Sequence, residues 1–323
     1  MDEMRSGIIP DAHKKAFGSY MSFDDKPISP GCIACKSGEW LCAFVGTNCN
    51  CKCEGCHNPN VNKGEVSKLT GIRGDVSTCT GINGEVNIDM MLELLAKHKF
   101  TGVGISGGEP LMYVDKMIDW ITKIKKHHPD IYIWNYTNGV YADTNTLKKL
   151  ADAGLDEIRF DLVADNFSGT VMRNMANAVK IIPSVGIEVP VILEQYNQLA
   201  NAIKIADAVG VKYVNLHDLY VNEKMYKNGL GGYKRYYEKL SGVQRDVYAS
   251  AILIYRLFRM IKDENMSIVP NDCTIINMQL QHFSFKYQEY NIANPGIMSF
   301  NDYMTMMFKQ HDSKDIILNA GVI

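Results

Sequence analysis

The stretch Cys49-Asn50-Cys51-Lys52-Cys53-Glu54-Gly55-Cys56-His57-Asn58-Pro59 holds four thiols within eight residues. Three of them, Cys49, Cys53 and Cys56, have the spacing C-x3-C-x2-C. Three thiolates on one short loop can hold three irons of a cubane iron–sulfur cluster and leave the fourth iron without a protein ligand. Such an open iron makes a cluster reactive rather than only an electron carrier. A structural zinc knuckle is the alternative interpretation, because C-x2-C pairs often bind zinc, but a knuckle normally needs a second pair.

A second motif, Gly107-Gly108-Glu109-Pro110, follows a predicted strand over residues 100–105. Two glycines allow the backbone to approach a ligand closely, and Glu109 supplies an acceptor for a cationic amine. The alternative is a plain turn from strand to helix with a glutamate at the helix N-terminus. Because a zinc knuckle would not predict this motif, the two motifs together favour a reactive cluster.

Together the two motifs resemble the radical S-adenosylmethionine (radical SAM) superfamily, over roughly residues 40–220. The resemblance implies that the C-x3-C-x2-C thiols bind a [4Fe-4S] cluster. It implies that Cys51, a ligand under the alternative spacing C-x-C-x2-C, is a bystander. It also implies that the Gly-Gly-Glu element binds the amino group of the SAM methionine. This chain departs from the family at Gly55, since an aromatic residue often precedes the third cysteine.

The resemblance further implies an activity. Flavodoxin or ferredoxin would reduce the cluster, the open iron would chelate SAM, and electron transfer would give methionine and a 5′-deoxyadenosyl radical. This radical would abstract hydrogen from a peptide, a protein or a small metabolite. An activase that installs a glycyl radical on a partner protein is one alternative, and His57-Asn58-Pro59 looks like the same position in such activases. The other alternative is a non-catalytic iron–sulfur or zinc protein.

Further candidate contacts to SAM or substrate lie later in the chain. Thr137-Asn138-Gly139 resembles the superfamily's common turn after the third strand, where a hydroxyl can touch SAM. Other polar residues near the carboxyl ends of later strands are expected to face the barrel mouth and to contact ribose, carboxylate or substrate. They are Arg159, Asp161, Glu194 and His217. Each could instead be a polar group of the barrel wall that is hydrogen bonded to a neighbour.

Strand and helix patterns alternate from about residue 87 to 220, which predicts an α/β fold with parallel strands and right-handed crossovers. Six strands are expected, and an incomplete (β/α)6 TIM-like barrel fits their number, as the resemblance also implies. The expected strands are 40–46, 100–105, 131–136, 157–162, 187–194 and 213–218.

A dinucleotide fingerprint, Gly102-x-Gly104-x-x-Gly107, lies within the second of these strands. In a nicotinamide site the glycines should follow the strand and open a helix directly, and an acid should end the next strand. Here Pro110 intervenes before the helix and the next strand ends Trp134-Asn135-Tyr136-Thr137. We therefore reject a nicotinamide site.

Three regions are expected along the chain: an N-terminal extension with a cysteine knuckle over residues 1–39, the partial barrel over 40–220, and a helical and strand extension over 221–323 that closes the barrel. Within the barrel region, the repeated pattern G-I-x-G-x-V predicts a small solenoid-like insertion at 64–87.

The knuckle and the next strand form a candidate second site, Cys32-x2-Cys35-x6-Cys42. These thiols could hold zinc or an auxiliary iron–sulfur cluster, with Cys79 or Cys273 as the fourth ligand. The alternative is an unmetallated knuckle with Cys42 as a buried strand residue, since free cysteines are common in protein cores.

Bulk composition narrows the class of protein. The chain has 323 residues, 46% of them hydrophobic, and a net charge of −2, so it carries no charge footprint for nucleic acid. No apolar run is long enough for a transmembrane helix, and the N-terminus lacks the pattern of a secretory signal. The nine cysteines are an odd number and most of them lie between Cys32 and Cys56, which favours metal binding in a reduced cytoplasmic compartment over a disulfide scaffold.

Overall fold

The computed structural model describes residues 13–15, 20–22, 26–37, 39–53, 56, 68–72, 88–221, 237–240, 243–246, 249–274, 287, 293–299 and 302–303. Its main element is an eight-stranded sheet in the order β13-β9-β8-β7-β6-β5-β3-β4. Seven strands pair in parallel, and β4 pairs antiparallel with β3. The parallel strands are β3 (Trp40–Phe44), β5 (Gly102–Ser106), β6 (Tyr132–Thr137), β7 (Glu157–Phe160), β8 (Ser184–Pro190), β9 (Tyr213–His217) and β13 (Val269–Asp272), and the antiparallel edge strand is β4 (Lys68–Ile72).

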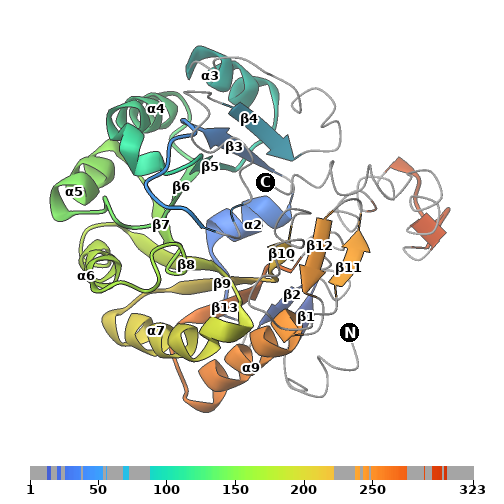
Figure 1. Cartoon of the computed structure of the whole chain (residues 1–323). Coiled ribbons are helices and arrows are strands. Elements are labelled where there is room, and N and C mark those ends of the chain that lie inside the picture. The colour runs from blue at the N-terminus through green and yellow to red at the C-terminus, as the bar shows by residue number, and fades with distance from the viewer. Residues whose placement is uncertain are drawn as a thin grey trace.

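Six helices cover the outer face of this curved sheet (Figure 1). They are α3 (Ile88–Lys97), α4 (Val114–His127), α5 (Thr144–Ala153), α6 (Gly169–Ala178), α7 (Tyr196–Val209) and α9 (Ala249–Asp263). Local signals fix their ends. For example, α5 begins after Asp143, whose Oδ1 accepts hydrogen bonds from the N–H groups of Asn145 and Thr146, and ends at Gly154 with a φ of +101°.

Strand residues alternate between the two faces of the sheet, as the period of two requires. Ile133, Ile158 and Ile187 belong to the large apolar core beneath the outer helices. Their neighbours Arg159 and Glu188 lie on the inner face and bond to each other. A parallel sheet covered on both faces is normally apolar on both. The inner face therefore carries a polar region on β7 and β8.

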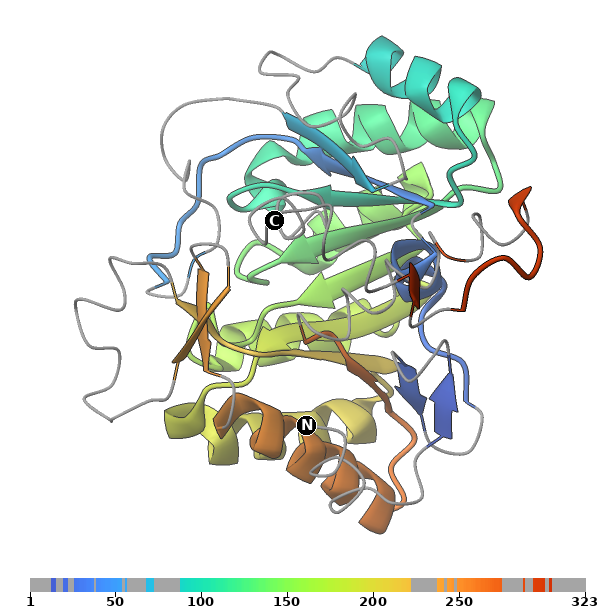
Figure 2. The same cartoon turned by 90° about the vertical axis from the view of Figure 1, so that its right-hand side faces the viewer.

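A further helix, α2 (Pro30–Lys36), lies on the inner face, inside the ring of strands (Figure 1). Its Ala34 packs in a cluster with Trp40, Cys42 and Trp134, and Cys35 packs against the same cluster. Figure 2 shows α2 at the opposite end of the strands from the loop that follows β3. The expected N-terminal extension thus supplies a helix that fills the amino-terminal end of the barrel.

The packing of Trp134 explains why Gly102 and Gly104, two glycines of the dinucleotide-like pattern, have no side chain. A Cβ on Gly104 would lie 2.9 Å from Cε2 of this indole ring, and a Cβ on Gly102 would lie 2.7 Å from Cζ3. Trp134 is fully buried and stacks on Trp40, with ring centroids 5.6 Å apart. These strand glycines make room for the ring.

The incomplete α/β barrel predicted from the sequence is confirmed, with two differences. A seventh parallel strand, β13, follows α9 and pairs with β9, and β4 adds an antiparallel edge. Among the described strands, β13 and β4 are the two edges, so the sheet stays open. The strand expected over 187–194 lies earlier in the chain, because β8 spans Ser184–Pro190.

Smaller elements flank the barrel. β1 (His13–Lys15) and β2 (Tyr20–Ser22) form an antiparallel pair near β13, and β10 (Tyr220–Val221), β12 (Val243–Asp246) and β11 (Tyr237–Leu240) form an antiparallel sheet (Figure 2). Most of the expected insertion at 64–87 lies outside the described residues, as does more than half of the expected extension over 221–323. No helix in the described part of the chain is long and apolar enough to cross a membrane. The region boundaries at 39/40 and 220/221 stay predictions.

Candidate active site

The loop after β3 carries the cysteine motif and is attached by its backbone to the loop after β5. Val45 N–H donates to Ser106 O over 3.0 Å, and Gly108 N–H donates to Gly46 O over 3.0 Å. Glu109 N–H donates to Asn48 O over 2.7 Å. This pairing continues the parallel ladder of β3 and β5 beyond both strands. It therefore fixes the chain up to the residue before Cys49.

Gly107 and Gly108 are required by this close pairing. A Cβ on Gly107 would lie 2.3 Å from Gly46 O, and a Cβ on Gly108 would lie 2.2 Å from Asn48 O. The φ of Gly107, +150°, is also one that residues with side chains rarely adopt. The sequence predicted that these glycines let backbone approach a ligand. The close approach that the structure contains is to the segment leading into the cysteine loop.

Glu109 is completely buried, and its carboxylate connects the loop after β5 to the turn after β6. Its Oε1 accepts hydrogen bonds from Leu111 N–H over 2.9 Å and from the Thr137 hydroxyl over 2.7 Å, and its Oε2 accepts from Asn138 N–H over 2.7 Å. Burial raises the pKa of Glu109 to about 7, although these hydrogen bonds act in the opposite direction. A carboxylate has about four acceptor positions. Glu109 therefore holds the turn after β6 in place and retains acceptor capacity for one further donor.

Asn138 extends this connection to the cysteine loop. Its Nδ2 donates to Asn50 Oδ1 over 2.8 Å and lies 3.9 Å from Cys49 Sγ. Its Oδ1 accepts from Val140 N–H over 3.1 Å, which sets the orientation of the amide. Two predicted site residues, Thr137 and Asn138, therefore lie against Glu109 and the first cysteine.

The cysteine loop has one hydrogen bond within itself and one to the segment after β7. Cys49 Sγ accepts a hydrogen bond from Cys51 N–H over 3.4 Å, and the Cys53 thiol donates to Ala164 O over 3.8 Å. Burial, and after it the charge of Asp161, raises the pKa of Cys53 to about 12. The carboxylate of Asp161 accepts from Val163 N–H and Ala164 N–H, and burial raises its pKa to about 6.

The donor set suits a cluster better than a single ion. Cys49, Cys53 and Cys56 are near enough for their charges to affect one another's pKa. In the described part of the chain, however, the one group of His, Cys, Asp and Glu ligand atoms within 4.8 Å of one another lies elsewhere. Among the described residues, the three thiols therefore do not converge on one point as the ligands of a single zinc ion do, and their assignment to separate irons of a cubane stays a prediction.

Arg159 bonds to residues of the inner face and of α2 rather than lying at the mouth of the barrel. Its guanidinium pairs with Glu157 through Nε, with Glu188 Oε2 over 3.1 Å and with the Ser29 hydroxyl over 3.2 Å. It also lies over the Trp134 ring, 5.1 Å from the centroid. Since Ser29 is the N-cap of α2, Arg159 attaches that helix to the sheet and has the hydrogen-bonded wall role that was the alternative interpretation.

Two further predicted residues lie in different surroundings. Glu194 is exposed on the 3-10 helix η4 (Leu193–Gln195), beyond the end of β8, and so does not occupy the expected strand position. His217 ends β9 and contacts Glu188 through Nε2. Burial by itself lowers the pKa of His217, but the charge of Glu188 raises it overall. Sequence reasoning missed Glu188, although an acid in an otherwise apolar strand pointed to the inner face.

The predicted second site is brought together only in part. Burial, and after it the charge of Cys32, raises the pKa of Cys35 to about 12, so these two thiols lie near each other. The Cys32 thiol donates to Asn215 Oδ1 over 3.3 Å, Cys35 packs beside the Trp40 and Trp134 rings, and Cys42 is buried in β3. Their sulfurs are not a group within 4.8 Å among the described residues. Cys79 lies outside those residues, as do Gly55 and His57-Asn58-Pro59.

The chain is similar to a family of iron–sulfur domains and to a curated relative. Residues 37–178 match the 4Fe-4S single cluster domain family. The chain is 27% identical over 212 residues to a protein of Methanocaldococcus jannaschii described as a glycyl-radical enzyme activating enzyme, covering 64% of this chain and 53% of that protein. The chain therefore spans about half the length of this curated relative.

Solved structures with a related fold include SuiB of Streptococcus suis, crystallised with S-adenosylmethionine. It matches with a TM-score of 0.51 and 12% identity, over 73% of this chain and 50% of that one. Methylornithine synthase matches with a TM-score of 0.49 and 12% identity, over 86% and 82%. The SuiB likeness is one of fold. The family and the curated relative confirm the resemblance to the radical SAM superfamily that the two sequence motifs predicted.

Proposed function

We propose that this chain is a radical SAM enzyme that uses a [4Fe-4S] cluster on Cys49, Cys53 and Cys56. The observation that carries the proposal is the backbone pairing of Val45, Gly46 and Asn48 with the loop after β5. This pairing brings the three thiols and the Gly-Gly-Glu element to the same carboxyl end of the sheet, where parallel α/β folds place their sites.

The residues present suit both groups. Three thiols would hold three irons, and residues of the loops after β5 and β6 would hold SAM. The chemistry supplied by a bound cluster and SAM is one-electron cleavage of the sulfonium, which gives methionine and a 5′-deoxyadenosyl radical that takes a hydrogen atom from substrate. Glu109, through its remaining acceptor position, would receive a hydrogen bond from the SAM ammonium.

The rest of the site orients and shields these groups. Asn138 fixes Asn50 and the start of the cysteine loop by hydrogen bonding. Asp161, held by Val163 N–H and Ala164 N–H, faces the region of Cys53 and is the best placed of the later candidates to contact SAM or substrate. Glu194 on η4 and His217 at the end of β9 would contact substrate.

The substrate proposed is a peptide, a protein or a small metabolite, and flavodoxin or ferredoxin would supply the electron. A second candidate function is activation of a glycyl-radical enzyme, and the description of the Methanocaldococcus jannaschii relative supports it. An assay for a protein-centred glycyl radical would separate the two. Cysteine usage supports a reduced, cytoplasmic setting.

The proposal is tested by reconstituting the protein with iron and sulfide without oxygen, reducing it with dithionite and adding SAM. Mass spectrometry should find 5′-deoxyadenosine and methionine in equal amounts, formed only when both dithionite and SAM are present. Absence of 5′-deoxyadenosine from protein that carries a full cluster would overturn the proposed activity.

A further inference from the structure

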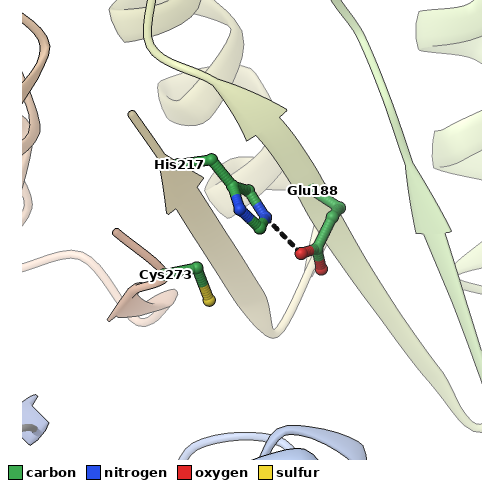
Figure 3. A group of neighbouring side chains, drawn as sticks. All are labelled: Glu188, His217 and Cys273. Carbon is green, nitrogen blue, oxygen red and sulfur yellow. Dashed lines mark hydrogen bonds and ion pairs between the residues drawn. The ribbon is translucent and has the colours of Figure 1, made fainter. Parts of the chain in front are cut away.

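A group of potential metal ligands lies on the inner face of the barrel, apart from the cysteine loop. Glu188 on β8, His217 at the end of β9 and Cys273 just after β13 come from three adjacent parallel strands. Figure 3 shows that the three side chains extend into one shared region between these strands. The carboxylate, imidazole and sulfur ligand atoms all lie within 4.8 Å of one another.

Neighbouring side chains orient these three groups. Glu188 Oε2 accepts hydrogen bonds from Arg159 Nη1 over 3.1 Å and from Asn215 Nδ2 over 2.6 Å, so Oε1 is the oxygen directed at His217. Asn271 Nδ2 donates to Cys273 Sγ over 3.0 Å. Hydrogen-bond donors of this kind hold metal ligands in position and stabilise their negative charge.

The donor set and its exposure indicate which ion fits. One thiolate, one imidazole and one carboxylate together suit Zn²⁺, a cation of borderline softness. The side chains of Glu188 and His217 are 16% and 20% exposed, so solvent reaches the group. Three protein ligands with an accessible fourth position are typical of catalytic rather than structural zinc.

Binding of an ion would change the protonation of the group. Without an ion, Glu188 pairs with Arg159 and with His217, and burial raises the pKa of the Cys273 thiol, which keeps its proton. The ion would replace the proton between His217 Nε2 and Glu188 Oε1, and the Cys273 thiol proton would pass to solvent. A purely hydrogen-bonded wall explains the contact of Glu188 with His217 but gives no role to the sulfur beside them.

We propose that Glu188, His217 and Cys273 form a Zn²⁺ site on the inner face of the barrel, with water or a substrate group as the fourth ligand. This site differs from the predicted Cys32, Cys35 and Cys42 knuckle. It uses one cysteine rather than several. It also does not depend on SAM cleavage by the cluster.

The test uses the cluster-reconstituted protein, loaded with Zn²⁺ and freed of excess by gel filtration. Elemental analysis should find one zinc per chain in addition to the cluster iron. X-ray absorption at the zinc edge should show one sulfur at about 2.3 Å with nitrogen and oxygen at about 2.0–2.2 Å. A zinc shell with two or more sulfurs would place the ion at the cysteine loop or the knuckle and overturn the proposal.

Variants give a second readout. His217→Ala and Cys273→Ser should lose the zinc while keeping their iron, which reports that the barrel and the cluster loop remain folded. Asn271→Ala should weaken zinc binding by roughly 10- to 100-fold, as second-shell changes do. Cys32→Ser and Cys35→Ser are the matched controls and should retain one zinc. Retention of zinc by both His217→Ala and Cys273→Ser, or no zinc in the unaltered protein, would contradict the site.

Discussion

Replacing Cys53 by serine is expected to abolish both cluster binding and the production of 5′-deoxyadenosine, whereas replacing Cys51 by serine leaves both intact. Cys53 is one of three thiols placed to bind separate irons, and a hydroxyl is a poor substitute for thiolate on iron. Cys51 contributes its backbone N–H to Cys49 Sγ, and serine keeps that donor. Iron and sulfide content and 5′-deoxyadenosine yield are measured on both proteins, reconstituted side by side.

This pair of variants separates the two ligand spacings that the sequence allows. C-x3-C-x2-C requires Cys49, Cys53 and Cys56, and C-x-C-x2-C requires Cys51 in place of Cys49. Loss of the cluster in Cys51→Ser, with retention in Cys49→Ser, would establish the alternative spacing. Cluster retention in Cys53→Ser would exclude both.

Replacing Gly108 by alanine should prevent cluster assembly without unfolding the barrel. The new methyl group would lie 2.2 Å from Asn48 O and 2.5 Å from Thr47 O, and both are backbone atoms that cannot rotate away. The segment before Cys49 must therefore move. Overpacking of this kind costs about 1–3 kcal/mol, which lowers the population of the cluster-binding loop roughly 5- to 150-fold. Iron content after reconstitution at limiting iron measures the loss.

Gly186 in β8 provides the matched control. It lies within a strand, on the inner face, and an added Cβ would meet its nearest atoms at 3.6 Å, which is ordinary contact. Gly186→Ala should bind iron as the unaltered protein does, and both variants should show the same circular dichroism. Equal iron content in the two variants would mean that the Gly-Gly element does not position the cysteine loop.

Local patterns in the sequence were enough to predict six of the seven parallel strands of the barrel. The six predicted strands are apolar runs separated by amphipathic helices, and each of them forms. β13 was missed because Val269-Pro270-Asn271-Asp272 contains a proline and two polar residues, so it lacks the apolar run of a buried strand. Its polar residues are accommodated because Asn271 bonds to Asn215 and Asp272 accepts from the Tyr255 hydroxyl. Neither partner is near in sequence.

The inner face of the barrel was the least predictable part of the site. Strand alternation places Glu188 there, but the prediction extended the strand to Glu194 because Pro190 was not recognised as its end. The position of α2 was not predictable from its own residues. Gly31 faces the Trp134 ring and the Arg159 guanidinium, and only the folded sheet brings those groups together. A small residue such as Gly31 indicates a close contact, but the sequence does not show which side chains make that contact.

The measurement that bears most directly on the account is electron paramagnetic resonance of the dithionite-reduced protein, with and without SAM labelled with ¹⁵N at its amino group. A cluster with one iron free of protein ligands should give a [4Fe-4S]⁺ signal that changes on addition of SAM, with ¹⁵N hyperfine coupling in the double-resonance spectrum. A signal that saturating SAM leaves unchanged, or protein that binds zinc at the cysteine loop and gives no signal, would contradict it.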